Sequence, residues 1–195
     1  MHYQNYPAVR GAYIQQRVLD VYRRLPSLSY PFYAGALMPL LPMPSRMMSY
    51  QEMAQASSCH VSDVARMCGS EDGATHIDRR KGRALILYNA DRPNGRILWT
   101  QTHEMAHLFL GHTVSDGSSV NQESEADYFV WNLLAPLPIL RAMGIQSDIE
   151  IMVWFGLSEQ ASAIHLKRYR KWCAGHIKTA WENDMLRIFR EEYGV

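Results

Sequence analysis

The chain has 195 residues, enough for one domain that buries a hydrophobic core of its own. Hydrophobic residues make up 47% of the sequence and charged residues 20%, which is typical of a folded globular protein and excludes an intrinsically disordered one. The formal net charge is +1 at pH 7, so the protein has no overall field that would attract nucleic acid or an anionic membrane.

The N-terminal third alternates between helical patterns and an irregular segment. Apolar residues at helical spacing predict a first helix over Gly11–Arg24. Five of the nine prolines fall in Pro26–Ser49, which predicts a long irregular connection. Two short helical patterns follow, Tyr50–Ala56 and Val61–Met67. Their outline is similar to a helix-turn-helix, but Arg66 is the single cation in this stretch, so we favour packing helices over a DNA-binding interpretation.

The middle of the sequence predicts a small sheet followed by a long helix. The apolar run Ala84–Tyr88 has strand character, and Ala74–Ile77 is a candidate to pair with it. Turn-forming residues then precede a helical pattern that continues to about His112, with either Asn94 or Thr100 as its N-cap.

The C-terminal part is predicted to be helical throughout. Ser119 and Gln122 have the spacing of a capping box, which begins a helix that runs to Leu134. Ser147 and Ser158 are candidate caps of two further helices. The sequence as a whole therefore predicts a single, mostly helical α+β domain with a small sheet packed near the long central helix.

The central helix carries the most specific motif, because residues 103 to 107 match H-E-x-x-H. On a helix this spacing leaves the imidazoles of His103 and His107 about 40° apart on one face, so both can bind one ion. Neutral imidazoles suit Zn²⁺, and a catalytic zinc site has three protein ligands and leaves the fourth position to water. Zinc would lower the pKa of that water to about 7, and Glu104 is placed to accept its proton rather than to bind the metal.

The third ligand must come from elsewhere in the sequence. The metzincin pattern requires Gly and His where this chain has Leu110 and Thr113, which excludes that class. His112 could join the site only if the helix ended and the chain bent back. We prefer Glu123, on the next predicted helix, to its neighbour Glu125, which we expect to be exposed to solvent.

A carboxylate one helical turn after the third ligand completes the predicted site. Asp127 lies on the same helix face as Glu123, so it could accept the second ring N–H of a ligating histidine and fix its tautomer. We therefore predict one zinc ion per chain, held by His103, His107 and Glu123, with Glu104 as the catalytic base.

These motifs together resemble a known class of peptidase. The pattern is similar to the gluzincins, in which a Glu on a later helix completes H-E-x-x-H and an Asp or Asn follows four residues on. More narrowly, HEMAHLFLGH (His103–His112) and ESEADYFVWNLLAP (Glu123–Pro136) resemble the ImmA/IrrE family of metallopeptidases. On this view residues 50–172 form a family-like core, residues 1–49 a helical and Pro-rich N-terminal extension, and residues 173–195 a C-terminal helical extension.

The chain departs from the family pattern at two positions. Asp127 stands where the family usually has Asn, and His165 stands in a late helix where Arg would be expected. Neither departure removes a metal ligand. Outside the motif region, four histidines lack a partner at ligand spacing and are interpreted as ordinary polar residues: His60, His76, His165 and His176.

The family resemblance implies a zincin-like fold and a zinc-dependent endopeptidase, whose substrate is often a helix-turn-helix repressor. Two alternatives remain open. In one, the protein is a zinc-containing regulator that binds a transcription factor without cutting it. In the other, residues 50–68 and a late basic cluster bind DNA. Such a cluster is usually a solvated helix face, so we expect no nucleic acid as a direct ligand. The cluster comprises Lys167, Arg168, Arg170 and Lys171.

The cysteines and the N-terminal segment indicate the compartment. There are three cysteines without C-x-x-C spacing, which favours neither a disulfide framework nor a thiolate zinc site and fits a reducing environment. Residues 1–30 carry Tyr, Gln, Arg and Asp throughout and never form the apolar core of a secretory signal. We therefore expect a cytoplasmic protein without a membrane partner.

Overall fold

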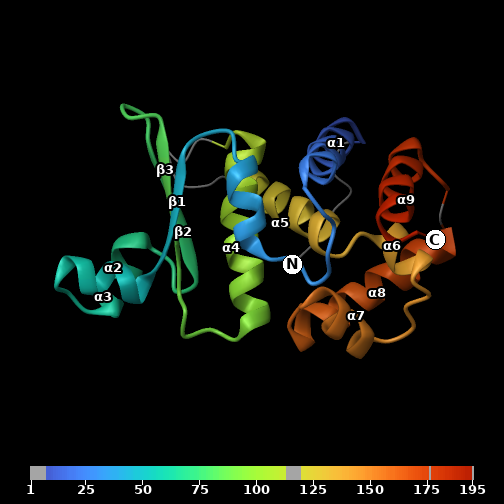
Figure 1. The fold of residues 1–195 in the computed structure, drawn as a ribbon. Coiled ribbons are helices and arrows are strands. Elements are labelled where there is room, and N and C mark those ends of the chain that lie inside the picture. Colours follow the sequence, from blue (N-terminus) through green and yellow to red (C-terminus); the bar gives the residue numbers. More distant parts are fainter. Residues whose placement is uncertain (1–7, 113–119, 176, 195) are drawn as a thin grey trace.

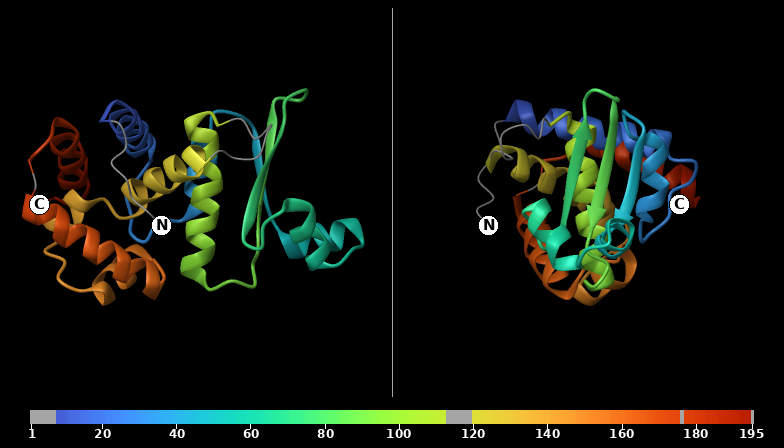
Figure 2. Two further views of the ribbon diagram at one scale, coloured as in Figure 1. Left: turned by 180° about the vertical axis from the view of Figure 1, so that it is seen from behind. Right: turned by 90° about the vertical axis from the view of Figure 1, so that its left-hand side faces the viewer.

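The computed structural model describes residues 8–112, 120–175 and 177–194, and its elements pack in layers on either side of the H-E-x-x-H helix (Figure 1). Seen from the front and from behind, α2 and α3 lie outside the sheet, α4 covers its inner face, α1 and α5 follow, and the C-terminal helices form the far end (Figures 1 and 2). The elements are α1 (Ala8–Arg24), η1 (Ala34–Leu40), β1 (Ser45–Ser49), α2 (Tyr50–Ser57), α3 (Val61–Cys68), β2 (Gly73–Asp78), β3 (Arg83–Tyr88), α4 (Asn94–Leu110), α5 (Val120–Leu134), α6 (Leu137–Ala142), α7 (Asp148–Phe155), α8 (Glu159–Gly175) and α9 (Ala180–Tyr193).

This mostly helical α+β architecture with a small sheet confirms the predicted fold class. The strand order is β1-β3-β2: β2 pairs with β3 as predicted, in the antiparallel direction, and β1 pairs parallel with β3. The prediction of an irregular connection over Pro26–Ser49 is wrong in two places, because Ala34–Leu40 forms the 3-10 helix η1 and Ser45–Ser49 is β1. The strand follows Pro44 directly, and its partner lies about forty residues later, so no hairpin pattern marks it in the sequence.

The two faces of β3 bury different clusters. Ala84 and Ile86 point into the main core with α4 and the helices behind it, whereas Leu87 joins a smaller cluster with Tyr50 and Val64 under α2 and α3. The helix pair α2 and α3 therefore serves to cover the outer face of the sheet, which is the packing interpretation that the sequence favours.

A glycine allows α4 to approach β2 closely. A Cβ atom on Gly73 would lie 2.4 Å from the Thr100 methyl group and 2.8 Å from the carbonyl oxygen of Leu87. Glu104 follows Thr100 by one turn on the same face of α4, so the contact also sets the distance between Glu104 and the sheet.

The sequence predicts the end of α4 better than its beginning. The N-cap of α4 is Pro93 and no side chain caps this helix, so the expected caps Asn94 and Thr100 are both wrong. The helix ends at Leu110, and Gly111 adopts a left-handed conformation with φ of 69°. The expected capping box at Ser119 lies outside the described residues.

The C-terminal helices confirm the predicted caps. Ser147 and Glu150 form a capping box at the beginning of α7, and the Ser158 hydroxyl accepts a hydrogen bond from the Ala161 amide at the beginning of α8. Among residues 8–112, 120–175 and 177–194, every helix is too short or too polar to cross a lipid bilayer.

Candidate metal centre

Helices α4 and α5 pack side by side and bring the predicted ligands together. The Nε2 atoms of His103 and His107 lie 3.2 Å apart. From α5, one oxygen of the Glu123 carboxylate lies 3.1 Å from the Nε2 of His103, and the other lies 3.5 Å from the Nε2 of His107. His103, His107 and Glu123 thus form a group of donor atoms that could hold a metal ion.

The spacing of these donors fits a four-coordinate ion. Zinc binds imidazole nitrogen and carboxylate oxygen at roughly 2.0–2.2 Å, so two donors of a tetrahedral site should lie about 3.3 Å apart. The three observed separations are 3.2, 3.1 and 3.5 Å. The three donor atoms are therefore already spaced to share one ion, and a tetrahedral ion held by them would take its fourth ligand from outside this group.

The second ring nitrogen of His103 faces a carboxylate. Its Nδ1 lies 3.1 Å from Asp127, one turn after Glu123 on α5. A carboxylate accepts a hydrogen bond, so in the neutral imidazole Nδ1 carries the proton and Nε2 has the lone pair that a metal would bind. This is the contact that the spacing of Glu123 and Asp127 predicts.

The second ring nitrogen of His107 faces another imidazole. The Nδ1 of His112 lies 3.0 Å from the Nδ1 of His107, and the Nε2 of His112 lies 3.0 Å from Glu125. The same Glu125 carboxylate accepts two hydrogen bonds from Arg10, at 2.8 and 2.7 Å. His112 therefore stands behind His107 and does not belong to the group of converging donors.

The expectation that Glu125 is exposed to solvent is wrong, because 8% of its surface is accessible. The face of α5 that carries Glu125 packs against α1, which supplies Arg10. The sequence does contain one signal for His112: Gly111 precedes it, and a glycine at this place commonly ends a helix and reverses the chain. The pairing of Arg10 with Glu125 has no local signal, since 115 residues separate them.

The two imidazoles differ in their affinity for protons. Burial lowers the pKa of His103, but hydrogen bonds to Asp127 and Glu123 outweigh it and raise the pKa to about 10. Burial and the neighbouring charge of His103 lower the pKa of His107 to about 4. Without a metal, the pair therefore shares one positive charge at neutral pH, at the place where the donors would surround a cation.

Glu104 lies next to the converging donors but faces β2. The Thr75 hydroxyl donates a hydrogen bond to its backbone carbonyl at 3.2 Å, and its side chain lies against Gly73. Burial raises the pKa of Glu104, whereas the charge of His103 and a hydrogen bond to Thr75 act in the opposite direction. A half-buried carboxylate with a raised pKa is suited to accept and release a proton.

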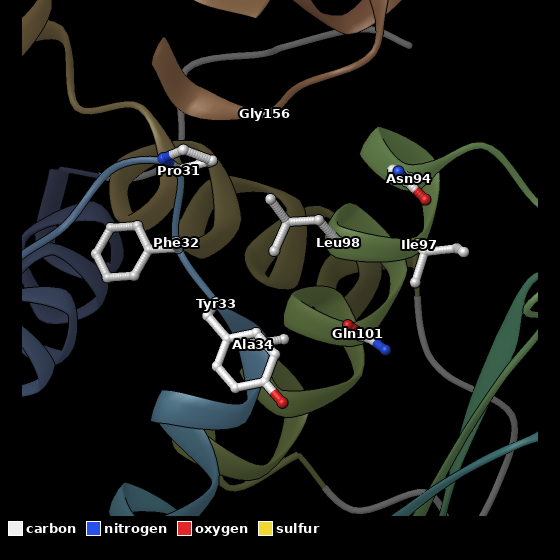
Figure 3. Close-up of a pocket in the computed structure, with 9 residues that line it drawn as sticks. All are labelled: Pro31, Phe32, Tyr33, Ala34, Asn94, Ile97, Leu98, Gln101 and Gly156. Atoms are coloured by element: carbon white, nitrogen blue, oxygen red, sulfur yellow. The ribbon is translucent and has the colours of Figure 1, made fainter. Parts of the chain in front are cut away.

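A separate cavity of about 230 Å³ lies on the other side of α4 (Figure 3). Gln101 is two residues before His103, which places it about 200° around the helix from the imidazoles. The cavity is therefore not part of the metal centre. Its lining residues are Pro31, Phe32, Tyr33, Ala34, Asn94, Ile97, Leu98, Gln101 and Gly156.

The remaining histidines and the basic cluster have structural surroundings. His60 and His76 are exposed, and His176 lies outside the described residues. His165 is 1% exposed, donates a hydrogen bond to the carbonyl of Ala135 at 2.6 Å and stacks on Trp131. The cluster at 167–171 is only partly solvated, since the Arg168 guanidinium lies over the Trp131 ring.

No family model matches this sequence, and no curated protein matches it. The residues and their geometry therefore carry the functional argument.

Proposed function

We propose that the protein is a zinc-dependent peptidase of the gluzincin type, related to the ImmA/IrrE metallopeptidases that its motifs resemble. One observation carries the proposal: the Nε2 atoms of His103 and His107 and the carboxylate of Glu123 lie 3.1 to 3.5 Å from one another. Two imidazoles and one carboxylate, with one corner left open, are the ligand set of catalytic zinc rather than of structural zinc. The same donors suit Zn²⁺ better than Mg²⁺ or Ca²⁺, which prefer oxygen ligands.

The side chains around this group have separate roles in peptide hydrolysis. Zn²⁺, when bound, would polarise the peptide carbonyl and lower the pKa of a water molecule. The carboxylate of Glu104 accepts the proton of the attacking water and passes it to the nitrogen of the leaving amine, for which its raised pKa is suitable. Asp127 keeps the Nδ1 proton on His103 and so keeps Nε2 available as a ligand.

The substrate that we propose is a protein, with a helix-turn-helix repressor as the first candidate. Support for this substrate comes from the resemblance of residues 103–112 and 123–136 to the ImmA/IrrE family. The net charge of +1 favours neither strongly acidic nor strongly basic substrates.

Metal content is the first test of the proposal. The purified protein should contain one zinc per chain by elemental analysis, and the His103→Ala and Glu123→Ala variants should lose most of it. Glu159→Gln, an exposed carboxylate at the beginning of α8, serves as the control and should keep the zinc. Equal zinc in the wild type and both ligand variants would refute the site.

Cleavage is the second test, and it also separates the proposal from a regulator that binds without proteolysis. Glu104→Gln should retain zinc and the binding of a helix-turn-helix repressor while hydrolysis of that repressor falls by about 10²–10⁴-fold. If the wild type binds the repressor and zinc but cuts neither the repressor nor unfolded casein, the binding regulator is the better description.

A further inference from the structure

A hydrogen-bonded chain leads away from His107 on the side of the metal centre that Asp127 does not reach. Three side chains follow one another in it: His112 lies behind His107, Glu125 behind His112, and Arg10 behind Glu125. We propose that His112, Glu125 and Arg10 are a positioning relay that fixes the tautomer and the ring orientation of His107, and thereby sets the affinity of the centre for zinc. This inference rests on the proposed function of the centre.

The direction of each hydrogen bond follows from the last acceptor in the chain. The carboxylate of Glu125 can only accept, so the Nε2 of His112 donates to it at 3.0 Å. A neutral His112 then has its lone pair on Nδ1, which accepts from the Nδ1 of His107 at 3.0 Å. The proton of a neutral His107 is thus on Nδ1, and its Nε2 lone pair faces His103 and Glu123. Among neutral imidazoles, this assignment alone satisfies every contact.

The burial of His112 and Glu125 makes their hydrogen bonds costly to lose. His112 is 5% exposed and Glu125 is 8% exposed, so neither can replace a lost partner by bulk water. A buried carboxylate is stable only when a countercharge and hydrogen bonds compensate its desolvation. Arg10 provides both through a bidentate pair at 2.8 and 2.7 Å, which fixes the plane of the carboxylate as well as its charge.

Both ligating histidines would thus have a protonated Nδ1 and an Nε2 available to the metal, but different side chains hold the two Nδ1 protons in place. Asp127 contacts His103 directly, from the same helix that provides Glu123. His107 does not contact its carboxylate directly: the imidazole of His112 lies between His107 and Glu125. Because Arg10 belongs to α1, the relay also connects the N-terminal helix to the metal centre.

The backbone allows His112 to take this position. Gly111 turns the chain with a positive φ of 69°, and the His112 amide donates to the carbonyl of His107 at 2.9 Å. His112 could therefore matter only because it is buried at the end of α4. The experiment must distinguish this structural role from an effect on zinc binding through His107.

The test compares two substitutions of His112 by zinc affinity, measured in competition with a chromophoric chelator. In His112→Leu no acceptor faces His107, and the Kd for zinc should rise about 10–100-fold. In His112→Asn the amide oxygen occupies the place of Nδ1 and can still accept from His107, so much of the affinity should return. His165→Leu is the control: it makes the same change at another buried histidine, and its Kd should stay within twofold of the wild type.

A spectroscopic readout tests the tautomer itself. In the metal-free wild type above the titration range of His107, ¹⁵N chemical shifts should show a protonated Nδ1 and an unprotonated Nε2 on His107. His112→Leu should give a mixture of the two tautomers. Glu125→Gln is a second variant should His112→Leu fail to fold, and it should weaken zinc binding less than Glu125→Ala.

The possible results separate the relay from the proposed function. Zinc lost in His103→Ala but bound with wild-type Kd by His112→Leu would leave the metal centre standing and overturn the relay. Equal losses in His112→Leu and His112→Asn, with an unchanged His107 tautomer, would overturn it in favour of a structural role. A wild-type protein that binds no zinc would overturn both.

Discussion

The carboxylate of Glu123 contacts both imidazoles of the H-E-x-x-H motif, His103 with one oxygen and His107 with the other. This contact connects α4, which carries the two histidines, to α5, which carries Glu123. Zinc binding should therefore hold α4 against α5 and stabilise the folded protein, because the unfolded chain does not preserve the group of donors.

Zinc should raise the thermal stability of chelator-treated protein. At a free zinc concentration of about 100 times Kd, linkage gives about 2.7 kcal/mol, which corresponds to roughly 5–10 °C in Tm for a chain of this size. Differential scanning calorimetry with and without zinc measures the shift. His76→Ala, an exposed histidine, should show the same rise, and His107→Ala should show almost none. A full rise in His107→Ala would mean that zinc stabilises through another site.

The hydrogen bond between Asp127 and His103 should affect zinc affinity according to what replaces the carboxylate. Asp127→Ala removes the acceptor at 3.1 Å from Nδ1, and we expect the Kd for zinc to rise about 10–100-fold. Asp127→Asn keeps an acceptor oxygen and should cost less than tenfold. Chelator competition gives both constants, and an affinity of Asp127→Ala equal to that of the wild type would contradict the assigned role.

The close approach of β2 to α4 predicts a strong effect of a single methyl group. In Gly73→Ala, the new Cβ would meet the Thr100 methyl and the Leu87 carbonyl, so we expect a loss of about 1–3 kcal/mol in the free energy of unfolding. Thr100→Ser removes one of these two contacts and should recover part of the loss in the double variant. Urea denaturation provides the values.

Gly175→Ala is the matched control for that experiment, because a Cβ at this last residue of α8 would meet nothing within 4 Å. Its free energy of unfolding should change by less than about 0.5 kcal/mol. A Gly73→Ala variant as stable as Gly175→Ala would show that α4 and β2 can separate without cost.

His165 predicts a dependence of stability on pH. Burial and the charge of Arg168 lower its pKa to about 3, against about 6.5 in the unfolded chain. Between these values the unfolded state binds a proton that the folded state refuses, so stability is full above pH 6.5 and falls as the pH decreases toward 3. The resulting loss in the free energy of unfolding amounts to roughly 5 kcal/mol at most.

The measurement is a series of urea titrations from pH 7 to pH 4, carried out on the wild type and on His165→Gln. Because the glutamine cannot titrate, the variant should lose much less stability over this range. Parallel curves for the two proteins would show that other groups are responsible for the acid sensitivity.

The sequence predicts those parts of the fold and site that depend on local patterns. The caps at Ser147 and Ser158 mark the beginning of α7 and α8, and a short continuous apolar run marks β3. The spacing within H-E-x-x-H, together with an acid on the next helix, predicts which residues converge, because a helix holds side chains at known angles. Each of these signals can be recognised from residues that lie close together in the sequence.

The parts that the sequence does not predict are formed by contacts between distant segments. Strand β1 is defined by its pairing with β3, and Glu125 is buried because α1 brings Arg10 to it. Helix periodicity places Glu125 away from Glu123, which is correct, but it cannot show that another helix covers that face. A glutamate that is exposed to solvent and one that is buried in an ion pair look the same in the local sequence. Only the partner residue distinguishes them.

The bidentate contact between Arg10 and Glu125 bears on where the protein can be shortened. A chain that begins at residue 50 would contain His103, His107 and Glu123, yet it would leave the Glu125 carboxylate without its guanidinium and one edge of β3 without β1. It would also remove α1 from α5, against which it packs, and take Ile14 and Val18 out of the main hydrophobic core. The smallest fragment that retains a working centre must therefore include the first helix, and expression trials should extend it toward the N-terminus rather than trim it to the motif.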